Sequence, residues 1–164
     1  MCLKTWPKSK VTNIGNVAFY GCKNLTSITI PSSVRSIGAS AFFNCRGVNK
    51  LNINTNNLSN IAMDSFSCLG NLNEVVIPKG VQTLSSGAFS NCNTLGKVTL
   101  PNGLKEIGSL SLDGLITEIN IPVSVQKIDS PIKSPSALLF RRINAPTLGE
   151  NAEFPSDTKI YVRK

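Results

Sequence analysis

The chain has 164 residues, of which 41% are hydrophobic and 16% charged, a composition typical of a single soluble globular domain. It contains no histidine, which excludes histidine-based catalytic triads and imidazole zinc sites. No apolar run approaches the roughly 18 residues of a membrane span, and residues 1–8 lack the apolar segment of a secretory signal peptide. We therefore expect either a cytosolic protein or a segment cut from a longer, exported chain.

The net charge of +8 is distributed unevenly along the chain. Residues 58–164 carry ten bases against nine acids, whereas residues 1–57 carry bases and no acid. These bases are Lys4, Lys8, Lys10, Lys23, Arg35, Arg46 and Lys50. A polyanion such as nucleic acid is one candidate partner. A solvated basic end is the favoured interpretation, because no aromatic side chains alternate with these bases to stack on nucleotides.

In chain order, the first elements are similar copies that begin at Val11, Val34, Leu58, Val81 and Leu104. Their spacing is constant, except that the second copy is one residue longer than the first, third and fourth and the fifth is two residues shorter. The first copy reads V-T-N-I-G-N-V-A-F-Y-G-C-K-N-L-T-S-I-T-I-P, and the fourth reads V-Q-T-L-S-S-G-A-F-S-N-C-N-T-L-G-K-V-T-L-P. A nearly fixed period of this length predicts stacked structural repeats, that is, a solenoid.

Each copy, numbered from its first residue, is apolar at positions 1, 4, 9, 12, 15, 18 and 20. Positions 18 and 20 alternate with positions 17 and 19, which are expected to be exposed, and this is the period of a half-buried strand. The proline that usually follows ends this strand, because it has no amide hydrogen. We expect a second short strand at positions 1–4 and one helical turn between them, as at Ala39–Cys45.

One copy cannot bury its seven apolar side chains alone, but stacked copies can. The predicted fold is a β-dominated α/β solenoid, a right-handed coil of about six turns with one parallel strand per repeat of ~23 residues. The strands are expected to centre on Thr29, Asn52, Val76, Thr99, Asn120 and Asn144. Phenylalanines at position 9, including Phe42, are expected to form a continuous buried spine.

The pattern L-x-x-I-x-I-P-x-x-V-x-x-I-G-x-x-A-F-x-x-C resembles the BspA-type leucine-rich repeats of bacterial and protozoan surface proteins. Regular copies cover residues 11–124. Irregular terminal coils cover 125–164, with strands expected at Ile143–Pro146 and Ile160–Val162. The resemblance implies one leucine-rich-repeat domain over 1–164, part of a longer chain at the cell surface or outside the cell. It also implies adhesion or binding to a protein, including a host or extracellular-matrix protein, or to a glycan.

Four of the five cysteines follow the repeat. Cys22, Cys45 and Cys92 occupy position 12, and Cys68 lies one position earlier. Because their spacing equals the repeat period, they form a column, and a column cannot surround a tetrahedral metal ion. We expect Cys22, Cys45 and Cys92 to be buried, reduced and free of metal, and Cys2 to be free and exposed.

No residue pattern indicates catalysis. The nine acids are scattered, and the glycines recur with the repeat without forming a phosphate-binding loop. The resemblance carries no catalytic residues either. We therefore predict a non-enzymatic protein with no cofactor and no metal.

The candidate binding residues are the exposed strand positions, which stacking gathers into one surface. They are Lys50, Asn52, Glu74, Val76, Lys97, Thr99, Glu118, Asn120, Arg142 and Asn144. Those at position 17 alternate strictly in charge, from Lys50 to Arg142, and so predict a ladder of opposite charges. The leading hypothesis is a protein-interaction or adhesion module. The alternatives are a structural spacer within a longer repeat protein and a basic module for polyanions.

Overall fold

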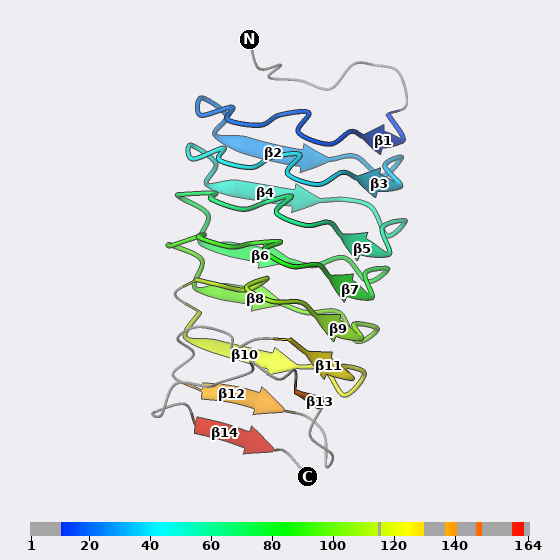
Figure 1. The fold of residues 1–164 in the computed structure, drawn as a ribbon, viewed down its shortest axis with the longest axis vertical. Coiled ribbons are helices and arrows are strands. Elements are labelled where there is room, and N and C mark those ends of the chain that lie inside the picture. The colour runs from blue at the N-terminus through cyan, green and yellow to red at the C-terminus, as the bar shows by residue number, and fades with distance from the viewer. Residues whose placement is uncertain (1–10, 115, 130–136, 141–146, 149–158, 163–164) are drawn as a thin grey trace.

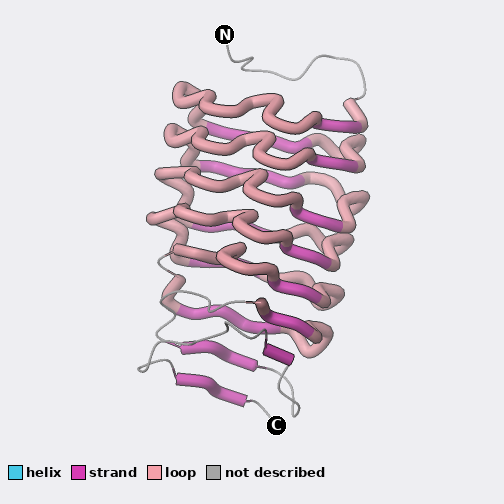
Figure 2. The backbone as a smooth tube through the Cα atoms, in the orientation of Figure 1, coloured by secondary structure: helices cyan, strands magenta, loops and turns pink. Residues whose placement is uncertain are grey.

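The computed structural model describes residues 11–114, 116–129, 137–140, 147–148 and 159–162. The chain winds into about five turns of a solenoid with parallel strands (Figure 1). Each coil contributes a longer strand, a short strand and a stretch of turns, and the described residues include no helix (Figure 2). The solenoid fold predicted from the repeat is therefore confirmed.

The longer strands form one column in which all pairing is parallel. They are β2 (Ser27–Ile30), β4 (Lys50–Ile53), β6 (Glu74–Val76), β8 (Lys97–Thr99), β10 (Glu118–Ile121), β12 (Ala137–Phe140) and β14 (Lys159–Val162). Their exposed side we call the strand face. The strand expected over Ile160–Val162 is confirmed by β14.

The short strands form a second column, as predicted for positions 1–4, in which every registered pair is parallel and no registered pair joins β3 to β5 among the described residues. They are β1 (Asn13–Ile14), β3 (Ser36–Ile37), β5 (Asn60–Ile61), β7 (Thr83–Leu84), β9 (Glu106–Ile107), β11 (Lys127–Ile128) and β13 (Thr147–Leu148). The side chains at position 4 of the repeat, such as Ile61 and Leu84, point into the core and are fully buried.

The core lies between the two columns and the turns. In β2 the alternation is complete, because Ile28 and Ile30 are buried while Ser27 and Thr29 are exposed. The described residues at the predicted apolar positions of the inner coils are buried, except Ile53, which is partly buried. In the first coil, Val11 and Phe19 are only partly buried, as expected near an end of a stack.

Positions 5–12 form tight turns, so the helical turn expected at Ala39–Cys45 is wrong. Every second backbone amide in this segment donates a hydrogen bond to the carbonyl oxygen three residues earlier. The amide of Phe43, for example, donates to the carbonyl of Ser40 at 3.1 Å. Ser40 and Asn44 have φ angles of 53° and 61°, in the left-handed region. A segment with two left-handed residues so close together cannot be part of a right-handed helix. We call this side of the solenoid the turn face.

The other amides of the turn face donate to the next coil. Three bonds join the second coil to the third: Ser40 to Met63 at 2.9 Å, Phe42 to Ser65 at 2.8 Å and Asn44 to Ser67 at 3.0 Å. The pattern recurs at each junction up to the bond from Phe89 to Ser111 at 2.9 Å. These N–H groups all point toward the following coil, whereas peptide dipoles alternate along an ordinary strand. The turn face therefore fixes the register of the coils without help from the strands.

The predicted phenylalanine spine packs beneath this ladder. Phe19, Phe42, Phe66 and Phe89 stack in sequence with ring centroids 5.0, 5.5 and 5.4 Å apart. Phe42, Phe66 and Phe89 are almost completely buried. The spacing is close to the ~4.8 Å strand spacing, so each ring fills its own coil and touches both neighbours.

The sixth strand lies earlier in the sequence than predicted. β12 (Ala137–Phe140) pairs with β10 so that Ala137 lies opposite Glu118 and Leu139 opposite Asn120. The prediction that Ile143–Pro146 supplies the strand beside β10 is therefore wrong, because this coil is shorter than the repeat. Arg142 and Asn144, assigned to the strand face by the repeat spacing, lie outside the described residues.

The expectation that the position-12 cysteines are buried and reduced is confirmed in part. Cys45 and Cys92 are buried free thiols that donate to the carbonyl oxygens of Phe19 and Phe66, at 3.1 and 3.2 Å. Burial raises the pKa of Cys45, and it raises the pKa of Cys92 to about 12. Cys22 is disulfide-bonded, so the expectation that it is reduced is wrong. The expectation for Cys2 lies outside the described residues.

Candidate binding surface

The described candidate residues lie on the strand face as predicted, but the strands do not form one continuous ladder. Lys50 and Asn52 of β4 lie opposite Ser27 and Thr29 of β2. Glu74 and Val76 of β6 lie opposite Lys97 and Thr99 of β8. β2 and β4 make a sheet of their own, separate from the sheet that contains β6 and β8.

The ladder has two interruptions. Among the described residues, no registered pair joins β4 to β6, and a single pair, Lys97 with Glu118, joins β8 to β10. Both interruptions coincide with an irregular coil length. The coil that begins at Val34 is one residue longer than the regular coils, and we call it the long coil. The coil that begins at Leu104 is two residues shorter than the regular coils, and we call it the short coil.

The extra residue of the long coil lies in the bend that follows β4. Asn54 stands where the regular coils have proline, and the bend is held by Thr55, which is buried. The Thr55 hydroxyl donates to the carbonyl of Val34 at 2.8 Å and accepts from the amide of Asn57 at 3.1 Å. The bend is therefore stabilised by hydrogen bonds of its own side chains and backbone.

A hollow of about 390 Å³ opens where this bend meets β6, and we call it the β4/β6 hollow. Its floor and walls combine aliphatic side chains, of which Val76 is exposed and Ile53 partly buried, with three asparagines and two charged residues. The lining residues are Leu51, Asn52, Ile53, Asn54, Asn56, Glu74, Val75, Val76, Ile77, Pro78 and Lys79.

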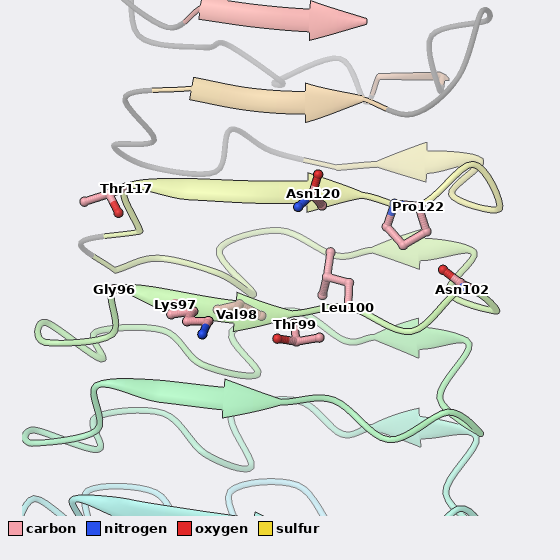
Figure 3. Close-up of a pocket in the computed structure, with 9 residues that line it drawn as sticks. All are labelled: Gly96, Lys97, Val98, Thr99, Leu100, Asn102, Thr117, Asn120 and Pro122. Carbon is pink, nitrogen blue, oxygen red and sulfur yellow. The ribbon is translucent and has the colours of Figure 1, made fainter. Parts of the chain in front are cut away.

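The two residues missing from the short coil are lost before β10, between the turn face and the strand. β8 and β10 therefore pair at their first residues and separate beyond them, leaving a hollow of about 460 Å³, the β8/β10 hollow. Figure 3 shows Gly96 and Thr117 at one end and Asn102 and Pro122 at the other. The remaining lining residues are Lys97, Val98, Thr99, Leu100 and Asn120.

The charge ladder predicted for position 17 holds only where strands are in register. Glu74 lies opposite Lys97, and Lys97 opposite Glu118, whereas the β4/β6 interruption separates Lys50 from Glu74. The one ion pair within 4 Å among the described residues lies elsewhere, between Lys127 and Asp129 at 2.8 Å. Asp129, by its hydrogen bond and its charge, raises the pKa of Lys127.

Sequence reasoning missed the residues that complete the two hollows. These are Asn54 and Asn56 in the bend after β4, and Asn102, Thr117 and Pro122 around β10. They lie outside positions 17 and 19, so a search restricted to exposed strand positions could not find them. The signal was present in the lengths of the long coil and the short coil, which depart from the period at these two junctions.

Other kinds of site are not formed by the residues that the structure describes. No three histidine, cysteine, aspartate or glutamate side chains gather there as metal ligands would. In the same residues, no helix has the length and apolar character needed to cross a bilayer.

Comparison with protein families decides the classification. Residues 12–134 match the family model described as the BspA type leucine-rich repeat region, a model that spans six copies of the repeat. The chain belongs to the BspA-type leucine-rich-repeat family. The resemblance given by the repeat motif is thus confirmed, and proteins of this family are typically non-enzymatic.

Solved structures of bacterial proteins share the fold of this BspA-type chain. A leucine-rich-repeat protein from Bacteroides ovatus superposes with a TM-score of 0.76 at 18% identity, over 93% of this chain and 52% of its own. A leucine-rich cell surface protein from Faecalibacterium prausnitzii superposes with a TM-score of 0.72 at 31% identity, over 83% of this chain and 38% of its own. A leucine-rich-repeat protein from Eubacterium ventriosum superposes with a TM-score of 0.65 at 33% identity, over 71% of this chain and 32% of its own.

The chain spans about half or less of the length of these three structures. No curated protein matches it significantly. The relative from Faecalibacterium prausnitzii is the one described as a cell surface protein.

Proposed function

We propose that this chain is a non-enzymatic segment of a cell-surface protein and binds a protein or glycan partner through its strand face. The observation that carries the proposal is the pair of hollows on that face. A spacer needs only regular coils, whereas here the coil length changes at two junctions and a hollow lined by polar and apolar residues lies at each.

Two further observations support a location outside the cytoplasm. A relative with 31% identity is described as a cell surface protein. The disulfide bond of Cys22 fits an oxidising environment, because such bonds are rare in reducing compartments.

The test is binding of the purified chain to a panel of immobilised extracellular-matrix proteins and glycans, measured by surface plasmon resonance. The panel contains fibronectin, laminin, collagen, mucin, heparin and plant and microbial polysaccharides. A strand-face variant, Thr99→Ala with Asn120→Ala, is compared with a control variant, Gln82→Ala with Gln126→Ala. Gln82 and Gln126 are exposed beside the short-strand column, away from both hollows.

We expect at least one surface to retain the parent chain and the control variant but not the strand-face variant. Binding that both variants keep would place the site elsewhere and contradict the proposal. Retention by no surface in the panel would favour the spacer interpretation. Retention by heparin alone, abolished by salt, would favour the polyanion interpretation.

A further inference from the structure

We propose that the β4/β6 and β8/β10 hollows are two successive subsites for one extended, neutral polysaccharide of β-1,4-linked pyranose sugars. The inference rests on the proposed function and names the partner of the same strand face. It follows from the chemistry of the linings, the distance between the hollows and the charge of the face.

The two hollows have similar linings although different coils build them, and each also contains charged residues, Glu74 and Lys79 in the first and Lys97 in the second. Each contains several neutral amides or hydroxyls: Asn52, Asn54 and Asn56 in one, Thr99, Asn102, Thr117 and Asn120 in the other. Amides and hydroxyls both donate and accept hydrogen bonds, which matches the hydroxyl groups of a sugar.

The floors of the hollows are aliphatic. Val75 and Ile77 are buried beneath the first hollow, and Val98 and Leu100 beneath the second, with a proline beside each floor. An aliphatic floor suits the C–H face of a pyranose ring, whose hydroxyls project around its edge. The volumes of about 390 and 460 Å³ lie within the range of about 300–1,000 Å³ that small-ligand sites occupy.

The spacing of the two hollows indicates a ligand that is itself a polymer with a regular repeat. One hollow lies between β4 and β6 and the other between β8 and β10, so they are two coils, or roughly 10 Å, apart along the stack. In an extended β-1,4-linked chain every second sugar presents the same face, and one disaccharide covers about this length. One polysaccharide lying along the stack therefore offers equivalent sugars to both hollows.

The charges of the strand face favour a neutral chain. Lys50, Glu74 and Lys97 alternate in sign along the stack, so this part of the face presents no block of one charge to a polyanion. The basic excess of residues 1–57 does not continue onto the later strands.

The same face is poorly suited to a protein partner. Protein interfaces concentrate their binding energy in tryptophan, tyrosine and arginine side chains. Among the residues whose side chains the structure describes, the strand face has none of these, and Val76 is its one large apolar side chain that is well exposed.

The test is isothermal titration calorimetry of the full chain with cello-oligosaccharides and chito-oligosaccharides of two and six sugars. We expect one of the two series to bind, with the hexasaccharide about tenfold or more tighter than the disaccharide, because it reaches both subsites. The affinity should change little between low and physiological salt, because the ligand is neutral.

Variants assign the two subsites. Asn54→Ala in the first hollow and Asn120→Ala in the second should each weaken hexasaccharide binding about fivefold, the loss expected for one neutral hydrogen bond. Each should leave the disaccharide affinity within about twofold, because the other subsite remains. Asn24→Ala is the matched control, since Asn24 is exposed on a bend away from both hollows, and its affinity should equal that of the parent.

Three outcomes would overturn the inference. The first is that neither series binds while strand-face variants still abolish capture on the surface panel, in which case the proposed function stands with another ligand. The second is equal affinity for two and six sugars, which would leave one subsite at most. The third is equal loss of affinity in Asn24→Ala and Asn120→Ala, which would place the sugar elsewhere.

Discussion

The turn face and the two strand columns are built by the same coils, but at the long coil the hydrogen bonds of the turn face continue while both columns are interrupted, between β4 and β6 and between β3 and β5. Bonds such as Phe42 to Ser65 and Phe66 to Ala88 continue across the long coil without a gap. On the strand face the same coil separates β4 from β6. The extra residue follows β4, outside positions 5–12, so the turn ladder is not affected by it.

This difference shows that one repeat can hold its neighbours in register and still tolerate a local loss of strand pairing. The turn ladder and the phenylalanine spine hold neighbouring coils in register, so the strands are not needed everywhere for that purpose. A strand pair can therefore be lost locally without unstacking the solenoid. The strand columns, unlike the turn face, can therefore accommodate coils of irregular length, and the predictions below test this division from the largest expected effect to the smallest.

Removing a ring from the spine should have the largest effect. Phe42→Ala is expected to lower the free energy of unfolding by roughly 3–5 kcal/mol, because the ring is buried and stacked on both sides. Equilibrium denaturation measures the loss. Phe19→Ala, at a partly buried position of the first coil, is the control and should cost less. A loss below about 1 kcal/mol for Phe42→Ala would mean that the spine does not hold the stack.

The bend that forms the β4/β6 hollow should depend on one hydroxyl. Thr55→Val keeps the shape of the side chain but removes the hydrogen bond to the carbonyl of Val34 and the acceptor for Asn57. We expect a loss of about 1–3 kcal/mol in the same denaturation measurement, since buried polar groups are left without a partner. An unchanged stability would show that the bend is not held in this way.

Charge reversal should have a smaller effect, and its size should depend on register. Glu74→Lys places two lysines opposite each other, since Glu74 pairs with Lys97, and should destabilise by up to about 1 kcal/mol, less at high salt. Lys50→Glu is the matched control, because Lys50 lies opposite Ser27 and across the interruption from Glu74. The Lys50→Glu change should leave the free energy of unfolding almost unchanged. Equal effects of the two changes would contradict the interruption of the ladder.

The cysteines should differ in their reactivity toward an alkylating reagent in the folded protein. At about pH 8, iodoacetamide should label the half-buried Cys68 before Cys45 and Cys92, which react as thiolates only after unfolding. Because the pKa of Cys92 is raised to about 12, its protonated thiol contributes stability that is full below the unfolded pKa of about 8.5 and declines as pH rises toward 12. Peptide mapping checks the order, and Cys22 should be labelled only after reduction. Rapid native labelling of Cys92 would contradict its burial.

The sequence predicted the fold because burial is periodic. Seven apolar positions recur in each copy, and any stack that buries them produces parallel strands and a spine at position 9. The hollows could not be predicted in the same way, because they depend on backbone hydrogen bonds across irregular bends, such as those of Thr55. The helical turn was wrong for a related reason: left-handed residues such as Ser40 leave no mark in the apolar pattern. The sixth strand was misplaced because the period was extended into a shorter coil, where Ala137 lies opposite Glu118.

The claim that coil length opens the hollows is tested most directly by a crystal structure of a chain with a regular second coil. The variant combines Asn54→Pro with deletion of Asn56, which restores the regular coil length and the proline that follows the other regular strands. The account predicts that β4 and β6 then pair in parallel, with Lys50 opposite Glu74 and Leu51 opposite Val75, and that the β4/β6 hollow closes. A structure in which β4 and β6 remain unpaired and the hollow persists would contradict it.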